Sequence, residues 1–289
     1  MKSKSLVLFT RTPLHVGAGA SVGIVDLPII RESHTGYPVI PGTSLKGVLA
    51  DLWNGDLVEK EIETKDGKKK KIKVREQEGE VEKLFGADTE KAKAGKLLIG
   101  ESKVVAFPVR SAKCGFAWVT CPLALGRLYR DLGIDHEKFE IKSDSCRAAE
   151  GLKLSDSIIL EEYCLKADEG NLQEDIVKTL TDLCDDTLWR SELASHLAIV
   201  SDEMFKYFVE NTCEIAQHVK IDDESGTAEG GALFNQENVP AETLFFTVLY
   251  ENADGCFEKL EDKLKSVNHL IQIGADATTG LGWCSVNLK

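Results

Sequence analysis

Two glycine-rich segments lie at opposite ends of this 289-residue chain and restrict where its core can form. The first runs from Thr12 to Ala20 (TPLHVGAGA), and the second from Ile273 to Trp283 (IGADATTGLGW). Both segments are too rich in glycine to be core. Glycine also lets a backbone approach a ligand closely and present its N–H groups. Two such loops with a lysine nearby predict a protein that binds a phosphate backbone.

The composition is that of an ordinary soluble globular protein, with 43% hydrophobic and 29% charged residues. No stretch of about 18 apolar residues is present, so we expect no membrane partner. The apolar run Leu6–Phe9 is too short for a signal peptide. None of the eight cysteines forms a C-x-x-C pair, which argues against zinc as a cofactor. We expect reduced thiols and a cytoplasmic location.

Charge is distributed unevenly along the chain, whose net charge is −13. Residues 154–265 hold 8 basic and 26 acidic side chains, whereas the remainder holds 27 basic and 22 acidic ones. Both glycine-rich segments lie in the positive part. Because local fields rather than net charge decide whether phosphate is attracted, the acidic total does not exclude a nucleic acid. The acidic part fits a solvated face, a surface that repels nucleic acid, or one that binds a basic partner.

Hydrophobic periodicity predicts a strand, a helix and a strand at each end of the chain. Strands are expected at 5–11, 97–110, 115–121, 154–165 (one or two), 243–250 and 283–288, a hairpin at 62–75, and helices at 44–54, 123–132, 174–190, 202–211 and 257–270. This order fits an α+β protein with a ferredoxin-like (RRM-like) βαββαβ core whose halves come from the two ends. The core of a single domain would comprise about 1–54, 97–121 and 243–289, with insertions at about 55–96 and 122–242.

The helix expected from residue 44 follows the breaker Pro41-Gly42, with Thr43 or Ser44 as its cap. Lys46 then stands on its first turn. A helix N-terminus offers free N–H groups, and a lysine there adds a positive charge for phosphate. The spacing is not that of a P-loop, and an ordinary surface lysine is the alternative interpretation of Lys46.

A projecting β-hairpin is expected at about 217–240, where two extended arms flank a polar tip at 223–230. His218 lies on the first arm, and Phe234 and Asn235 on the second. Phe234 is either a core residue or a wedge. Glu237 falls at the base of the hairpin, where it acts either as a second acid or as a salt-bridge partner.

The first glycine-rich loop does not fit a dinucleotide-binding motif. Five residues separate the strand from Gly17 and Gly19, and Pro28 interrupts the place where the helix would run. Beyond the glycines, Asp26 is either a turn-capping group or a functional acid. His15 has three possible roles: an acid or base, a ring that stacks on a nucleotide, or a hydrogen-bonded structural residue.

In combination, these segments resemble the RAMP superfamily of CRISPR RNA-binding proteins, and within it the backbone subunit of type III-B (Cmr) effector complexes. The similarity is strongest at 12–49, 231–247 and 271–286. It implies that Asp26 cuts bound target RNA and that the hairpin is a thumb that kinks the guide–target duplex. The residues that it implies for guide-RNA binding are Ser44 and Lys46 on the helix, Gly17 and Gly19 in the first loop, and Gly274, Thr278, Thr279, Gly280 and Gly282 in the second.

The resemblance also implies what the protein does. It predicts an antiviral endoribonuclease that polymerises head to tail along a CRISPR guide RNA, together with other Cmr subunits, and cuts target RNA at regular intervals. The cut would be an in-line attack by the neighbouring 2′-hydroxyl, supported by Asp26 and by Mg²⁺ or Mn²⁺ recruited with the RNA. A non-catalytic RNA-binding scaffold and a guide-processing endonuclease of the same superfamily are the alternatives.

Overall fold

The computed structural model describes residues 1–21, 23–53, 57–63, 69–75, 78–87, 93–167, 170–222 and 226–289. The strands are β1 (Lys2–Thr10), β2 (Val39–Ile40), β3 (Leu57–Glu63), β4 (Lys69–Arg75), β5 (Gly86–Ala87), β6 (Lys93–Ala94), β7 (Leu97–Ile99), β8 (Ser102–Ser111), β9 (Gly115–Thr120), β10 (Cys146–Ala148), β11 (Ser157–Leu160), β12 (Tyr163–Lys166), β13 (Leu197–Val200), β14 (Glu214–Ile221), β15 (Ala228–Asn238), β16 (Leu244–Glu251), β17 (Leu270–Gln272) and β18 (Trp283–Leu288). The helices are α1 (Gly42–Asp51), α2 (Glu78–Phe85), α3 (Pro122–Leu132), α4 (Glu174–Leu183), α5 (Thr187–His196), α6 (Asp202–Asn211) and α7 (Cys256–Ser266), with short 3-10 turns η2 (Glu150–Leu152) and η3 (Ala277–Thr279).

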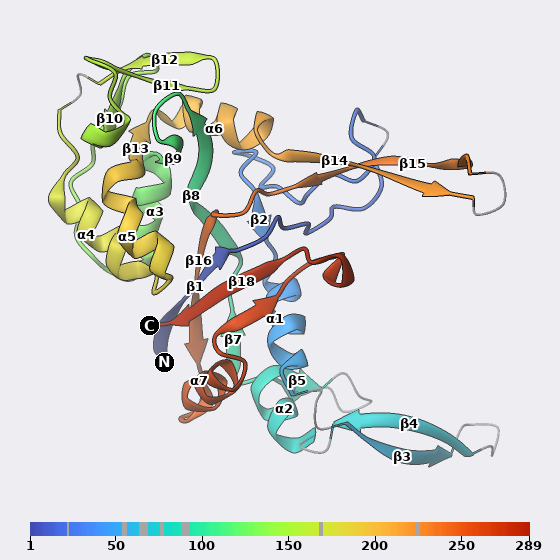
Figure 1. Ribbon diagram of the computed structural model, residues 1–289. Helices are drawn as coiled ribbons and strands as arrows, with labels where there is room; N and C mark the ends of the chain where they lie inside the picture. Colours follow the sequence, from blue (N-terminus) through green and yellow to red (C-terminus); the bar gives the residue numbers. More distant parts are fainter. Residues whose placement is uncertain are drawn as a thin grey trace.

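A mixed α+β architecture is built around one large, mostly antiparallel sheet (Figure 1). Its central strands follow the order β8-β16-β1-β18, and each is antiparallel to its neighbours. The first strand of the chain thus lies between two strands from its C-terminal end. The register pairs Leu6 with Thr247 of β16 on one side and with Leu288 of β18 on the other.

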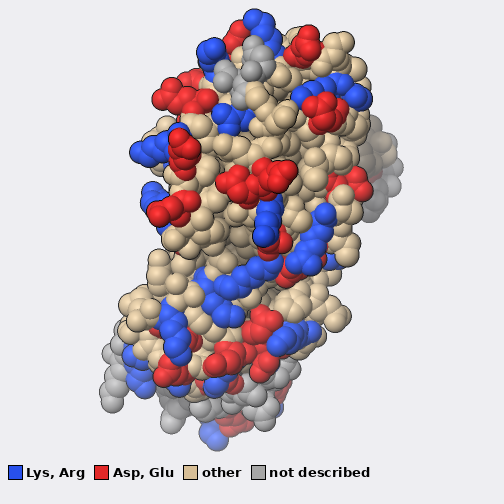
Figure 2. Space-filling model, turned by 90° about the vertical axis from the view of Figure 1, so that its left-hand side faces the viewer, with Lys and Arg blue, Asp and Glu red and all other residues tan. Residues whose placement is uncertain are grey.

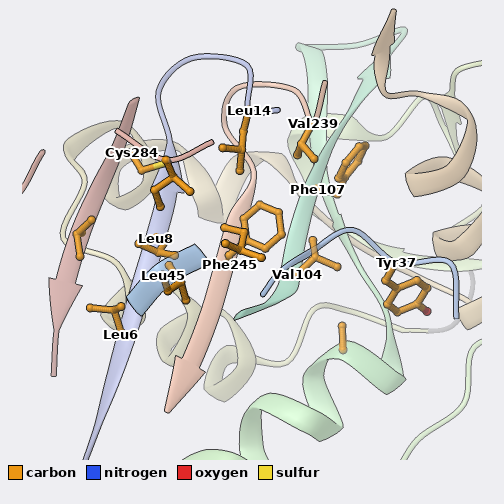
Figure 3. Packing of buried hydrophobic residues seen from close by; sticks show 14 of the residues in the cluster. Leu6, Leu8, Leu14, Tyr37, Leu45, Val104, Phe107, Val239, Phe245 and Cys284 are labelled. Atoms are coloured by element: carbon orange, nitrogen blue, oxygen red, sulfur yellow. The ribbon is translucent and has the colours of Figure 1, made fainter. Parts of the chain in front are cut away.

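Both faces of this sheet are covered, which explains why β1 reads as an unbroken apolar run. Side chains alternate between the two faces of a strand. Leu6 and Leu8 therefore pack with residues of α1 and α7, whereas Val7 and Phe9 pack with residues of α3, α4 and α5. Figure 3 shows part of the first cluster, into which Leu14 also points.

Strands from the middle of the chain extend the sheet beyond its predicted members. β13 pairs in parallel with β9, and β10 pairs with β13. The sequence pattern predicts no strand at 197–200. The four residues LAIV are all buried there, and a short apolar run directly after a helix carries no period by which it can be recognised as a strand.

Two hairpins project from the body in the same direction (Figure 1). β3 and β4 confirm a hairpin ending at Arg75, but its first strand begins at Leu57 rather than at the predicted residue 62, and its turn at 64–68 lies outside the described residues. β14 and β15 pair in an antiparallel two-stranded sheet of their own, with Gln217 opposite Asn235. Of the tip expected at 223–230, residues 223–225 lie outside the described part.

Three predicted helices differ in their boundaries. The helix expected from Ser44 begins at Gly42 after Pro41, and no side chain caps it, so the predicted cap at Thr43 or Ser44 is wrong. The helix expected at 174–190 is two helices, because Asp186 accepts a hydrogen bond from the Leu188 N–H and starts α5. The helix expected at 257–270 ends at Ser266, since the next residues include Asn268 and His269 in the left-handed conformation.

Among the described residues, no helix is long and apolar enough to cross a membrane. Figure 2 shows the side of the molecule that lies to the left in Figure 1, where α4 and α5 are found. Lys and Arg side chains cross the middle of this face, with Asp and Glu above and below them. Charges of both signs are therefore mixed on this side.

Candidate active site

The first glycine-rich loop pairs with two other segments through its backbone. Its residues 16–18 run antiparallel to 28–30. The Ile30 N–H donates to the Val16 carbonyl at 2.8 Å, and the Ala18 N–H donates to the Pro28 carbonyl at 2.9 Å. Leu14 and Val239 exchange backbone hydrogen bonds of 2.8 and 2.9 Å. Because both of these side chains are buried, they fix the loop and the root of the β14–β15 hairpin to the same core cluster (Figure 3).

The second glycine-rich loop packs directly against the first. The Ala275 N–H donates to the His15 carbonyl at 2.9 Å, and the Gly282 N–H donates to the Pro13 carbonyl at 2.8 Å. A Cβ atom at Gly274 would lie 2.1 Å from the His15 oxygen, and Gly274 has a φ of +82°. Glycine at 274 is therefore required for the contact between the loops. The two ends of the chain form one continuous surface here.

Asp26 lies on this surface with its side chain exposed. One carboxylate oxygen, Oδ2, accepts a hydrogen bond of 2.8 Å from the backbone N–H of Asn235 on β15. The next residue continues the contact, because the Leu27 N–H donates to the Asn235 carbonyl at 3.0 Å. The hairpin thus orients the side chain of Asp26, the candidate cutting acid predicted from the sequence.

His15 lies below the same surface and is only 5% exposed. Its Nδ1 is 2.6 Å from the carbonyl oxygen of Glu237, and a carbonyl only accepts, so Nδ1 donates. A Cβ atom at Gly17 would lie 2.7 Å from Nε2, so the absent side chain makes room for the ring. These contacts fit the structural interpretation of His15.

Glu237 forms a salt bridge with Arg31, which is one of the two roles that the sequence leaves open for it. Its Oε1 accepts from the Arg31 guanidinium at 2.5 Å, and its Oε2 accepts from the Ile29 N–H at 3.1 Å. The side chains of Glu237 and Arg31 are 10% and 19% exposed. Both carboxylate oxygens are thus occupied in a nearly dry environment.

The other predicted RNA-binding residues lie at separate places and differ in exposure, and Gly282 is buried. Lys46 stands on the second turn of α1, with no hydrogen bond or ion pair to any described residue, and Ser44 is half-buried near the helix start. In the second loop, Thr278 and Thr279 are exposed on η3. Gly19 and Gly280 both have φ values near +90°, with open space where a Cβ would stand.

The β14–β15 hairpin carries the predicted thumb residues. His218 and Phe234 are cross-strand partners whose rings stack with centroids 5.0 Å apart. Phe234 is exposed, so the core interpretation of this residue is wrong. The hairpin also exposes Ile215, Val219 and Leu233.

Within the described residues, no group of three or more His, Cys, Asp and Glu side chains is arranged to hold a metal ion. Asp26 offers one carboxylate oxygen that the Asn235 N–H does not occupy. The described protein groups therefore supply at most part of a coordination sphere in this place.

Comparison with known proteins identifies the family. The model of the RAMP superfamily matches residues 8–285. This chain belongs to the RAMP superfamily. It is 36% identical over 302 aligned residues to the CRISPR system Cmr endoribonuclease Cmr4 of Pyrococcus furiosus, an alignment that covers 100% of this chain and 96% of that protein.

Solved structures agree with this assignment. A crystal structure of oligomeric Cmr4 from Pyrococcus furiosus is similar to the chain with a TM-score of 0.73 and 29% identity, covering 100% of this chain and 98% of that one. A cryo-EM structure of the type III-B Cmr-beta complex bound to cognate target RNA contains a chain with the same fold, with a TM-score of 0.74 and 19% identity over 100% and 97% of the two chains.

Sequence reasoning missed Arg31 as part of the site. Arg31 contacts Glu237 across 206 positions of sequence, and no spacing rule links residues so far apart. Its only local signal is a charged side chain directly after the apolar pair Ile29-Ile30. It also missed Gln236, whose Nε2 donates to Asp276 at 2.8 Å and thereby joins the hairpin root to the second glycine-rich loop.

Proposed function

We propose that this protein is a backbone subunit of a type III-B CRISPR effector complex that binds guide RNA and cuts complementary target RNA. The observation that carries the proposal is the surface on which Asp26, both glycine-rich loops and the hairpin root meet. The full-length similarity to a Cmr endoribonuclease supports the reaction class. The chain is accordingly an endoribonuclease that acts in antiviral defence.

The proposed core is ferredoxin-like. β1, α1 and β8 would form its first βαβ half, and β16, α7 and β18 its second. The strand order β8-β16-β1-β18 supports this assignment, because it is the order that two interleaved βαβ halves produce. The β14–β15 hairpin would be the thumb, with the exposed Phe234 available to press against a nucleobase.

Guide RNA would be held by groups that contact phosphates and therefore tolerate any sequence. Lys46 offers a positive charge that no described residue pairs, on α1 and close to backbone N–H groups at the helix start. Gly19 and Gly280, with Thr278 and Thr279, offer open backbone and hydroxyl groups. Copies of the chain would stack head to tail along the guide and contact other Cmr subunits, as the oligomeric state named for the Pyrococcus structure suggests.

Chemistry would take place beside Asp26. The neighbouring 2′-hydroxyl of the target would give its proton to Asp26 while its oxygen attacks the phosphorus atom. A 2′,3′-cyclic phosphate would form, and the 5′-oxygen would leave and take a proton from water. The Asn235 N–H holds the Asp26 carboxylate through Oδ2, and its other oxygen would face the RNA. A divalent ion, Mg²⁺ or Mn²⁺, would supply charge stabilisation at the phosphate and take its remaining ligands from RNA and water.

Asp26→Asn tests the catalytic role, since it keeps the shape of the side chain and removes its charge. Loss of a general acid–base group costs about 10²–10⁴-fold in rate. The variant, assembled on guide RNA, should bind target as the wild type does and lose this much in single-turnover cutting. Cutting by the wild type should stop in EDTA and return with Mg²⁺ or Mn²⁺. If Asp26→Asn binds both RNAs and cuts at the wild-type rate, the protein's Asp26 is only a turn residue.

A further inference from the structure

The segment 27–31, which follows Asp26, contacts the edge of the hairpin through an isolated β-bridge. The Leu27 N–H donates to the Asn235 carbonyl, and the Glu237 N–H donates to the Leu27 carbonyl, both at 3.0 Å. Leu27 is thus paired in parallel with Gln236. The position of Asp26 relative to bound RNA therefore depends on how firmly this short segment stays attached to β15.

Among the described residues, two backbone hydrogen bonds join Leu27 to β15, and the Asp26 side chain accepts a third from the Asn235 N–H. An ion pair adds to these contacts. Glu237 belongs to β15, yet its Oε2 accepts the N–H of Ile29 on the opposite segment. Its Oε1 is held by Arg31, two residues further along the same segment. The Glu237 carboxylate therefore connects the hairpin to the segment at two points.

Arg31 itself is fixed from three directions. Its Nη1 donates to the carbonyl oxygens of Gly36 and Val209, each at 2.8 Å, and its Nη2 lies 3.3 Å from the Cys213 sulfur. The guanidinium thus joins the turn after the segment, the end of α6 and the hairpin root. A planar group with five donors in a fixed geometry can serve all of these acceptors at once, and a lysine cannot.

We propose that Arg31 is a positioning residue for target cleavage, which holds the Asp26 segment on the hairpin through Glu237. This inference rests on the proposed role of Asp26 as the cutting acid. Arg31 itself does not contact the RNA in this account. The distance between the β14–β15 hairpin, which would press on the target, and Asp26 at the base of this hairpin would thereby stay fixed.

Two substitutions remove the connection in different ways. Arg31→Lys keeps the charge and loses the simultaneous contacts. Glu237→Gln keeps the shape, but its single amide oxygen cannot accept from both Arg31 and Ile29. Glu32→Gln is the matched control, because Glu32 is also a buried partner of an arginine, Arg127, and its pair joins the loop to α3 without contacting β15.

All three variants are assembled on guide RNA, and single-turnover cutting, target affinity and amide hydrogen exchange are measured. Arg31→Lys and Glu237→Gln should cut about 10- to 100-fold more slowly at saturating target, because small misplacements of a catalytic group have effects of this size. Target affinity should stay within about twofold. Exchange should accelerate in peptides covering 26–31 and 234–237 and stay unchanged in β16. Glu32→Gln should cut at the wild-type rate.

Wild-type cutting by Arg31→Lys and Glu237→Gln overturns the proposal, and so does an equal loss in Glu32→Gln. A fall in target affinity that accounts for the whole effect also overturns it. Asp26→Asn, measured in parallel, separates this failure from that of the proposed function. It should lose cutting with unchanged exchange at 26–31 if Asp26 is the acid, whatever the Arg31 variants do.

Discussion

Replacing Gly274 by alanine is expected to push the two glycine-rich loops apart. The new Cβ would lie 2.1 Å from the His15 carbonyl oxygen, a backbone atom that cannot rotate away. Alanine at a φ of +82° also costs about 1–2 kcal/mol in strain. Loss of the adjacent hydrogen bond from the Ala275 N–H to His15 removes about 0.5–1.5 kcal/mol more. The free energy of unfolding should therefore fall by about 1.5–3.5 kcal/mol.

Gly280→Ala is the matched control for this experiment. Gly280 has a φ of +91°, but open space surrounds the position of its missing Cβ. It should therefore lose only the strain energy of about 1–2 kcal/mol. Equilibrium urea unfolding of both variants and the wild type gives the comparison, provided that the slope of the transition is unchanged. If Gly274→Ala is no less stable than Gly280→Ala, the close contact between the loops is not what requires glycine at 274.

Two further predictions concern RNA affinity and pH. Lys46→Ala should weaken guide binding equally for guides of different sequence and reduce the slope of log K against log salt by about 0.7, as expected for one lost phosphate contact to a single strand; an unchanged slope argues against that contact. Burial, with Asp186 nearby, raises the pKa of Glu242 from its ordinary 4.5 to about 7. The folded protein therefore binds this proton more tightly than the unfolded chain, and the stability that this provides at low pH is lost between about 4.5 and 7. Glu242→Gln should raise the free energy of unfolding at pH 8 and leave it nearly unchanged at pH 5, and equal effects at both values would contradict the burial of this carboxyl.

Features set by local patterns could be predicted from the sequence. The strands at both ends, the hairpin at 62–75 and the helix at 202–211 follow from apolar periodicity and turn residues within short windows. The boundary of α5 was missed because a capping contact by Asp186 outweighed a continuous apolar stripe.

Features set by distant contacts could not be predicted in this way. Glycine at 274 was attributed to RNA binding, yet the requirement that the structure reveals is the carbonyl of His15, 259 positions away. From the sequence, Glu237 is either a second acid or a salt-bridge partner, and only the structure shows its ion pair with Arg31. A glycine or a carboxylate shows that something approaches it closely, and only the fold shows which group this is.

The central claim is that Asp26 of each subunit makes one cut in the target. Assemblies reconstituted on one guide from mixtures of wild type and Asp26→Asn test it most directly, with the product formed at each position measured on end-labelled target. The amplitude at every position should fall in proportion to the fraction of Asp26→Asn and reach the background when that fraction is one. A ladder of products that persists at full amplitude in assemblies made only of Asp26→Asn would contradict the claim.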